Sequence, residues 1–186
     1  MRRALACLLL LWSGGTFAAE GPTKVSLNAL AAGALSRTNL AFGMLEGRFA
    51  LSKNLRITAG PALLEPEGGD VEYQFRAAAT LLAQLGRIQL DDRNLWVFSD
   101  AGTTRYRNRL RFTLPLEMGS SVVRVQLYDE AFYQEGGRGW FRNTIAAGVG
   151  VDTARPFSAD AYWMLQDDDR RPQASMFLVL FTLHLF

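Results

Sequence analysis

Arg-Tyr-Arg-Asn-Arg-Leu-Arg-Phe-Thr-Leu, residues 105–114, places an arginine at every second position. In a β-strand successive side chains point to opposite faces, whereas in a helix the same arginines would scatter around the axis. The stretch therefore predicts a strand with one cationic and one mostly apolar face. The cationic face carries Arg105, Arg107, Arg109 and Arg111, and the apolar face carries Tyr106, Leu110, Phe112 and Leu114.

The same alternation of polar and apolar residues recurs at 71–83, 87–98, 122–133, 141–151 and 157–166. In the stretch 141–151 it places Phe141 on the apolar face and Arg142 on the polar one. Three residues break the pattern, because Asp92, Asn94 and Asp129 fall on the apolar phase. We attribute these three to bulges or to positions near a rim of the sheet.

The first 18 residues have the composition of a secretory signal peptide. Arg2 and Arg3 precede a short apolar run that ends at Trp12, and small residues surround the expected cleavage site after Ala18. This run is too short for a spanning helix, which needs about 20 residues. The only cysteine, Cys7, lies within it, so we expect neither a disulfide nor thiolate chemistry in the exported chain.

Residues 19–186 suit a single domain. Hydrophobic residues make up 49% of the chain and charged residues 20%, with a formal net charge of +2, so neither disorder nor a nucleic-acid partner is indicated. No interior segment has the length and apolarity of a spanning helix. An exported chain of this kind can enter a membrane only as a closed barrel, whose strands satisfy each other's backbone hydrogen bonds.

Turn signals divide the exported chain into ten segments of about ten residues, the spacing typical of a membrane barrel. The predicted strands are 24–33, 40–51, 55–64, 71–83, 87–98, 105–116, 122–133, 141–151, 157–166 and 174–186. The tight connectors are 52–54, 85–86, 118–120 and 153–156, and the longer polar ones are 65–70, 100–104, 135–139 and 167–173. This alternation predicts an all-β, antiparallel, transmembrane up-and-down β-barrel with its tight turns in the periplasm.

The strand number is the weakest part of this prediction. The connector 36–39 is short although ten strands would make it external, and Pro61 interrupts the third predicted strand, where it removes a backbone donor. Eight or twelve strands therefore stay open.

The carboxy-terminal strand, residues 174–186, is apolar and ends in Phe186. It resembles the closing strand of bacterial outer-membrane barrels, which typically ends in Phe and is read by the barrel-assembly machinery. His184 departs from that pattern, and a buried last strand of a soluble sandwich is the alternative. We expect export to the outer membrane of a Gram-negative cell, with outer-membrane lipid and the assembly machinery as partners.

The free energy of burying charge decides which face of the arginine strand meets water. An arginine that faces lipid at mid-depth costs about 2–4 kcal/mol, so four on one strand would cost on the order of 10 kcal/mol, comparable with the stability of a whole domain. We therefore expect the arginines to face the lumen. A ten-stranded lumen is narrow, because eight strands are already filled by side chains.

Arginines in a narrow lumen need carboxylate partners. Acids on the inward phase are Glu46, Glu72, Asp91, Glu130 and Asp160, and Glu130 is the expected first partner because its strand follows the arginine strand. The predicted lumen network, which is also a candidate anion site, comprises Arg93, Arg105, Arg107, Arg109, Arg111, Arg124, Arg142, Asp91 and Glu130. Arginine pairs with carboxylate and phosphate alike, so the residue type does not separate a structural network from a binding site.

The sequence offers little for other chemistries. His184 is the sole histidine, and Thr182 is the nearest hydroxyl on its phase. The run Asp167–Asp169 can supply oxygen ligands to Ca²⁺, but arginines follow it directly, which favours a solvated loop. We expect no catalytic residue, no metal and no cofactor.

The segment 105–116, followed by Leu-Tyr-Asp-Glu-Ala-Phe at 127–132, resembles an uncharacterised family of small Gram-negative outer-membrane β-barrel proteins. That family carries an Arg-x-Arg-Asn-Arg-Leu-Arg strand and a Tyr-Asp-Glu-x-Phe strand. A glycine-rich strand, here 142–150, and a Tyr-x-x-x-Gln strand, here 162–166, follow. The resemblance covers about residues 87–186 and implies a barrel in the outer membrane, without a known activity or catalytic residue.

Three functional hypotheses follow. The first is a non-enzymatic outer-membrane barrel with an arginine–carboxylate lumen, which is structural or takes small anionic solutes. The second is a soluble periplasmic barrel that binds a ligand, with its arginines outward and its apolar face around the cavity. The third is an outer-membrane lipid-modifying enzyme that uses His184.

Overall fold

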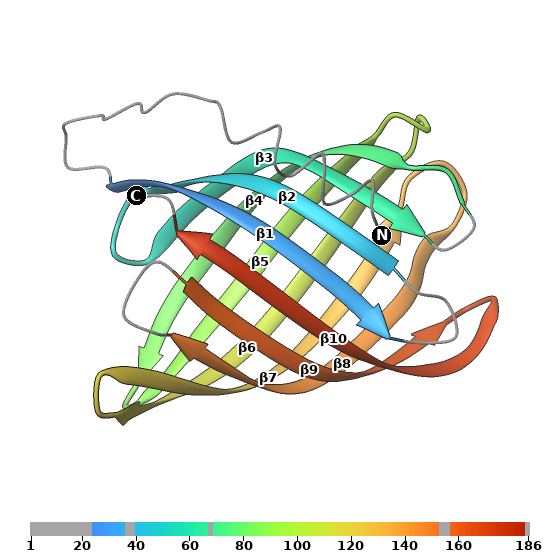
Figure 1. Cartoon of the computed structure of the whole chain (residues 1–186). Coiled ribbons are helices and arrows are strands. Elements are labelled where there is room, and N and C mark those ends of the chain that lie inside the picture. Colours follow the sequence, from blue (N-terminus) through green and yellow to red (C-terminus); the bar gives the residue numbers. More distant parts are fainter. Residues whose placement is uncertain (1–23, 36–39, 67–68, 153–156, 185–186) are drawn as a thin grey trace.

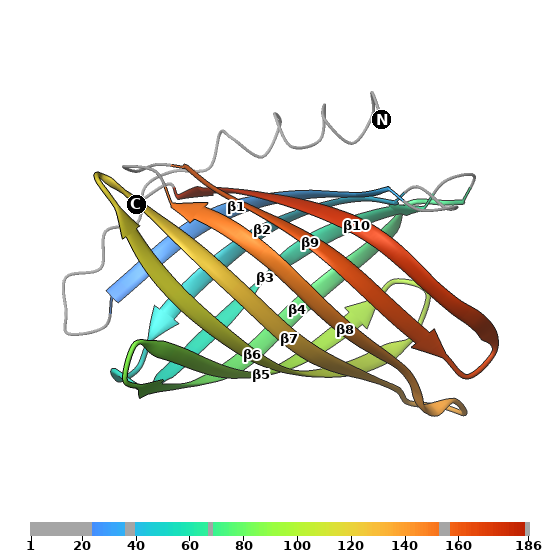
Figure 2. The same ribbon diagram turned by 90° about the horizontal axis from the view of Figure 1, so that it is seen from below.

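The computed structural model describes residues 24–35, 40–66, 69–152 and 157–184, which form ten strands in one closed antiparallel barrel (Figures 1 and 2). The strands are β1 (Lys24–Leu35), β2 (Leu40–Ala50), β3 (Leu55–Pro66), β4 (Glu72–Leu85), β5 (Ile88–Ser99), β6 (Thr104–Met118), β7 (Ser121–Gln134), β8 (Gly139–Asp152), β9 (Phe157–Asp168) and β10 (Arg171–His184). The predicted signal peptide and Phe186 lie outside the described residues.

Each strand pairs with the next one along the chain, and β10 closes the barrel against β1, with Ala32 opposite Leu180. The predicted up-and-down antiparallel barrel is confirmed, and of the strand numbers left open ten is the correct one. The closing pair also places Lys24 and His184 at the same end of the barrel, which we call the terminal end. We call the opposite end, which carries the β5–β6 and β7–β8 connectors, the loop end.

The prediction of a long polar connector at 167–173 is wrong. Strand β9 continues to Asp168 and β10 already begins at Arg171, where these two residues pair. Only Asp169 and Arg170 remain between the strands. Composition misleads here because the end of a paired strand can be as polar as a loop.

The ladder between β2 and β3 is interrupted where β3 carries Gly60 and Pro61. Pairing is present at Met44–Ala62 and resumes at Gly47–Ala59, and Pro61 has no N–H to donate between them. A Cβ atom on Gly60 would overlap the carbonyl oxygen of Leu45, so the two backbones approach too closely there for any other residue. Pro61 therefore interrupts one ladder locally but does not end the strand.

Apolar side chains cover the outside of the barrel and polar ones fill its inside. On β7, Leu127 is 52% exposed, whereas its neighbour Gln126 is 2% exposed and Glu130 is buried. This is the reverse of a water-soluble barrel, so the arrangement with outward arginines and an apolar cavity is excluded. No helix among the described residues is long and apolar enough to cross a membrane.

A β-bulge near the loop end of β8 changes the side-chain phase. Phe132 pairs with Arg142 but Tyr133 pairs with Trp140, so Phe141 is the extra residue. Trp140 is consequently outward and 61% exposed, while Phe141 is only 6% exposed. The prediction that Phe141 belongs to the apolar outer face is therefore wrong, whereas Ile145 beyond the bulge is exposed as expected.

Candidate functional site

The arginines of β6 point into the lumen and each contacts a carboxylate. Arg107 Nη2 lies 2.7 Å from Glu130 Oε2 on β7, and Arg105 Nη1 lies 3.2 Å from Glu72 Oε1 on β4. The β6–β7 register makes the first contact possible, because it places Glu130 opposite Arg109, one inward position from Arg107.

Asp91 on β5 serves the other two arginines of this strand. Its Oδ2 accepts a 2.7 Å hydrogen bond from Arg111 Nε, and its Oδ1 lies 3.4 Å from Arg109 Nη2. Asp91 and Arg111 are direct partners in the β5–β6 register. One carboxylate thus serves two guanidinium groups.

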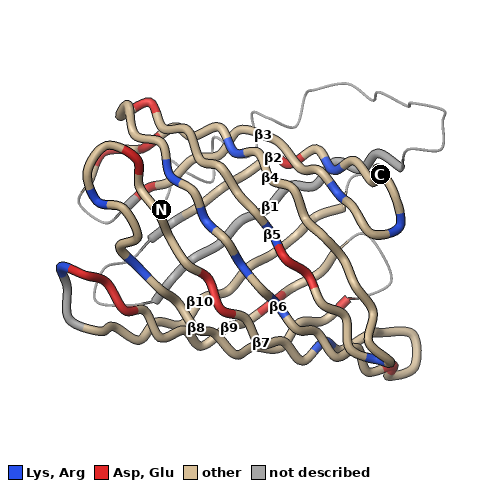
Figure 3. Tube along the Cα trace, turned by 180° about the vertical axis from the view of Figure 1, so that it is seen from behind, with Lys and Arg blue, Asp and Glu red and all other residues tan. Residues whose placement is uncertain are grey.

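A second shared carboxylate spans the lumen. Glu46 on β2 contacts Arg48 on its own strand at 3.3 Å and Arg93 on β5 at 3.1 Å. Strands β2 and β5 are not neighbours in the barrel, so the Arg93–Glu46 contact crosses the interior. Figure 3 shows such basic and acidic positions along the strands as well as at the ends of the barrel.

Polar contacts continue from β6 to β9. Arg124 Nη2 lies 3.0 Å from Asp160 Oδ1, and Gln126 Nε2 donates to the same oxygen at 2.6 Å. Gln126 Oε1 accepts hydrogen bonds from Arg111 at 3.1 Å and from the Tyr162 hydroxyl at 2.7 Å. A buried network of side-chain bonds therefore connects β6, β7 and β9.

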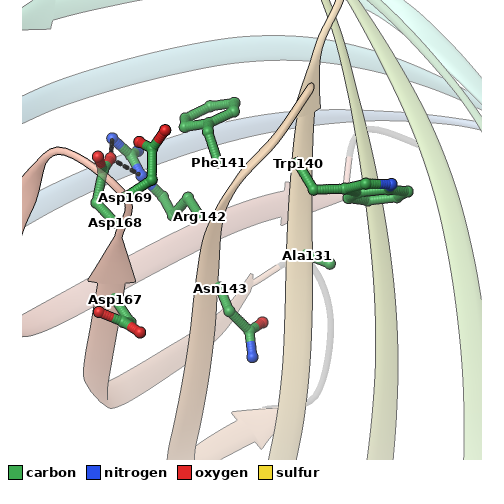
Figure 4. Close-up of a pocket in the computed structure, with 8 residues that line it drawn as sticks. All are labelled: Ala131, Trp140, Phe141, Arg142, Asn143, Asp167, Asp168 and Asp169. Atoms are coloured by element: carbon green, nitrogen blue, oxygen red, sulfur yellow. Dashed lines mark hydrogen bonds and ion pairs between the residues drawn. The ribbon is translucent and has the colours of Figure 1, made fainter. Parts of the chain in front are cut away.

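Arg142 belongs to a separate cluster at the loop end. Its Nε and Nη2 both donate to Asp168 Oδ2, at 3.0 and 2.9 Å (Figure 4). Arg138 contacts Asp168 at 3.1 Å and Asp169 at 2.6 Å. Desolvation alone would lower the pKa of Arg138, but the hydrogen bond to Asp169 and the charges of Asp168 and Asp169 raise it. Both carboxylates are thus held by arginines. The described residues include no cluster of acids, histidines or cysteines suited to a metal ion.

The lumen carries a cationic surplus. Arg76 donates to Gln74 Oε1 at 2.9 and 2.6 Å and stacks 4.3 Å above the Phe42 ring, but among the described residues it contacts no carboxylate. Arg56 likewise has no ion pair with any described residue. Because Glu46 and Asp91 are each shared, the interior acids do not balance the arginines.

Several guanidinium donors inside the barrel are buried and lack a hydrogen-bond partner among the described residues. They are the Nε atoms of Arg93, Arg107, Arg109 and Arg124. The Arg107 group also stacks 4.5 Å from the Phe132 ring centroid, and that of Arg109 lies 5.6 Å from the Tyr128 ring. The rings restrict these two side chains, and the buried Nε donors remain without a partner among the described residues.

Every predicted lumen residue lies on the inward phase, but the network joins only part of the set. Arg142 is grouped with Asp168 rather than with the β6 arginines. Sequence reasoning missed Asp168, which was assigned to a loop, and Arg56. It placed Arg76 on the polar face of 71–83 but did not include it in the candidate site. The period-two spacing of Arg56 with Thr58, which is buried, is a signal that could have found Arg56.

His184 has a partner that sequence reasoning also missed. The register of β9 with β10 places Ser158 opposite Thr182, and Ser158 Oγ lies 3.3 Å from His184 Nε2. Ser158 is buried at the terminal end of the lumen. Finding this pair requires the register between two strands, which spacing along one strand does not give.

Comparisons with known proteins identify a family and a fold. The model of a family described as a protein of unknown function, DUF2490, matches residues 35–176. No curated protein matches the chain. Among solved structures, the NanC porin is 8% identical over 84% of this chain and 98% of its own, with a TM-score of 0.51. LpxR from Salmonella typhimurium is 8% identical over 78% of this chain and 73% of its own, also with a TM-score of 0.51.

Proposed function

The chain belongs to the DUF2490 family, and we propose that it is a non-enzymatic outer-membrane β-barrel whose arginine-lined lumen binds or passes small anions. The barrel fold, which it shares with the NanC porin, and its apolar outer wall support the membrane location. Outer-membrane barrels carry this outward apolar band and a polar interior.

One observation carries the anion assignment: carboxylates inside the barrel are shared while arginines remain without one. Asp91 serves Arg109 and Arg111, yet Arg76 contacts only Gln74 and an aromatic ring among the described residues. A buried cation without a counter-charge is costly, and a small anion removes that cost. The same arginines would also attract anions electrostatically to a narrow lumen.

The same contacts support a structural role, in which the ion pairs hold the lumen closed. Planar-bilayer recording separates the two roles. We expect the purified barrel to show low conductance with a preference for anions, and Arg76→Gln to reduce that preference. Arg87→Gln, in the exposed β4–β5 turn, is the matched control. Absence of current from wild type and from Arg76→Gln would contradict passage and favour the structural role.

Cell fractionation and a heat-modifiability gel test the location. We expect recovery with the outer membrane and a mobility that changes on boiling, whereas recovery in the soluble periplasm would contradict the proposed membrane location.

We also propose that the assembly machinery reads the carboxy-terminal strand. Deleting Phe186 should then lower the amount of assembled barrel, and an unchanged amount would contradict this.

The Ser158–His184 pair favours a second candidate, hydrolysis of an ester in an outer-membrane lipid. A histidine within hydrogen-bond reach of a serine can take its proton as the serine oxygen attacks a carbonyl. Comparison of lipid profiles from wild-type, Ser158→Ala, His184→Ala and null strains tests it. The candidate requires the two variants to match the null strain, and identical profiles from wild-type and null strains would exclude the activity.

A further inference from the structure

The outer face of β5 to β9 carries a group of polar side chains within an otherwise apolar wall. We call Asp92, Asn94, Asn108, Asp129, Asn143 and Asp167 the outer polar row. Asn94 pairs with Asn108, and Asn143 pairs with Asp167, in continuous antiparallel ladders. The β5–β6 and β6–β7 registers show no shift at these positions, so the explanation of Asp92, Asn94 and Asp129 as bulges is wrong.

An aromatic layer borders this row on its loop-end side. Trp96 contacts Tyr106, Tyr106 contacts Trp140, and Trp140 contacts Tyr133, with ring centroids 5.5, 6.0 and 5.4 Å apart. On the terminal-end side, exposed apolar residues such as Leu127 and Ile145 follow. Aromatic girdles mark the membrane interface in such barrels, so the polar row on β5 to β8 lies on the hydrocarbon side of that girdle rather than at a rim.

The β5–β6 part of the row is satisfied internally. Asn108 Nδ2 donates to Asp92 Oδ1 at 2.7 Å and to Asn94 Oδ1 at 3.3 Å, and the Tyr106 hydroxyl donates to Asn94. These bonds fix Asp92, Asn94 and Asn108 in place. They also use the amide of Asn108, which leaves the row rich in acceptors.

The β7–β9 part of the row is not satisfied in this way. Asp129 and Asp167 are exposed, and neither side chain has a hydrogen bond or ion pair with any described residue. Asn143 accepts a 2.9 Å bond from the Thr144 backbone, which leaves its amide donor available. Polar groups that face hydrocarbon without a partner are costly, so the presence of Asp129 and Asn143 on the hydrocarbon side of the girdle implies a partner from outside the chain. Asp167, next to the last residue of β9, lies opposite Asn143.

A hollow of about 440 Å³ adjoins these groups near the β8 bulge. Outward-facing Ala131, Trp140, Asn143 and Asp167 line it on one side, and Phe141, Arg142, Asp168 and Asp169, where Arg142 is paired with Asp168, line the rest (Figure 4). The bulge contributes to the hollow's aromatic lining, because it turns Trp140 outward while Phe141, which also lines the hollow, faces inward. On its outward side the site thus combines a carboxylate, an amide and an indole ring around one depression, and the only arginine of its lining, Arg142, is held by Asp168.

The charges of the side chains in the outer polar row indicate which kind of ligand can bind there. Its ionisable members, Asp92, Asp129 and Asp167, are all acids, and no described side chain on the outward face of β5 to β9 strands is basic. A second copy of the chain would bring the same acids into contact, which disfavours a dimer. An occupant with hydrogen-bond donors or positive charge fits the carboxylates, and a cation fits the exposed face of Trp140.

We propose that the outer polar row and its hollow bind the headgroup of a membrane lipid through ammonium or hydroxyl donors. The inference rests on the membrane location proposed above but not on anion binding in the lumen. It assigns the barrel a second site, on its wall, with a chemistry opposite to that of its interior.

Lipid retention measured by native mass spectrometry tests this inference. The folded, delipidated barrel is offered phosphatidylethanolamine, whose ammonium carries N–H donors, or phosphatidylcholine, whose ammonium carries none. We expect wild type to retain phosphatidylethanolamine preferentially. Asp129→Asn combined with Asp167→Asn should weaken that retention by about tenfold or more, since hydrogen bonds to charged groups are lost. Glu135→Gln, in the exposed β7–β8 connector, should retain it.

Equal retention of the two lipids by wild type, or unchanged retention by the double variant, would overturn the inference. A dimer that dissociates in the double variant would instead assign the row to a second copy and overturn the lipid occupant. Heat modifiability of each sample shows that the barrel is folded. A failure of lipid retention in a folded, membrane-inserted barrel is thus distinct from a failure of the proposed location.

Discussion

The two faces of β6 meet opposite surroundings although their residues alternate along one strand. Inward Arg107 and Arg111 reach carboxylates at 2.7 Å, while outward Leu110 and Phe112 are exposed and have no polar group to satisfy. Outward Asn108, which follows Arg107 in the chain, donates hydrogen bonds to side chains of β5. Polarity is therefore the rule inside the barrel and the exception on its outer face.

The lumen and the outer wall also differ in how their charged side chains are compensated. In the lumen, charges are compensated by other strands of the same chain, as Arg93 and Glu46 show across the interior. On the wall, compensation ends at Asn108, and Asp129 and Asp167 have none among the described residues. The interior thus compensates most of its charges but leaves Arg56 and Arg76 without a carboxylate among the described residues, whereas Asp129 and Asp167 on the wall have no polar partner among those residues.

The largest expected effect on stability comes from placing an arginine, the residue typical of the lumen, on the outward face of the barrel. Leu127→Arg places a guanidinium in the lipid-facing surface and should lower the free energy of unfolding by about 2–4 kcal/mol. Denaturant titration of the barrel folded in vesicles measures the change. Glu135→Arg, in an exposed connector, should stay within about 0.5 kcal/mol of wild type. Equal effects of the two variants would contradict the assignment of faces.

A somewhat smaller loss should follow from breaking an interior pair. Glu130→Ala leaves Arg107 without its carboxylate and should cost about 2–3 kcal/mol, below the range for a dry interior because the Arg107 side chain keeps 24% exposure. The same vesicle titration detects it. Replacing Glu130 and Arg107 together by Leu should recover much of the loss, and additive losses in that double variant would argue against a direct pair.

The smallest effect on stability should come from the wall pair. Asp92→Leu combined with Asn108→Leu removes both partners of the 2.7 Å hydrogen bond and the donor of the longer bond to Asn94, whose oxygen still accepts from Tyr106. The double variant should change the free energy of unfolding by less than about 1 kcal/mol. Vesicle titration beside the Glu130→Ala barrel gives the comparison. A loss as large as that of Glu130→Ala would show that this pair holds the barrel together rather than serving a site.

Most of the fold could be predicted because a half-buried strand has a period of two, and turn residues separate such strands. The direction of the arginines followed from the cost of charge in lipid. The bulge at Phe141 could not be predicted, since one inserted residue leaves the local pattern intact. The partners of Arg93 and His184 depend on how strands meet in space, and the end of β9 at Asp168 was hidden by a polar composition.

The orientation of the β6 side chains tests the central claim most directly. Single nitroxide labels at positions 109 to 114, introduced through cysteine in the membrane-inserted barrel, report contact with oxygen dissolved in the lipid. Labels replacing Leu110, Phe112 and Leu114 should be accessible to oxygen, and labels replacing Arg109, Arg111 and Thr113 should be shielded from it. The opposite phase, or no alternation, would contradict a barrel with its arginines inside.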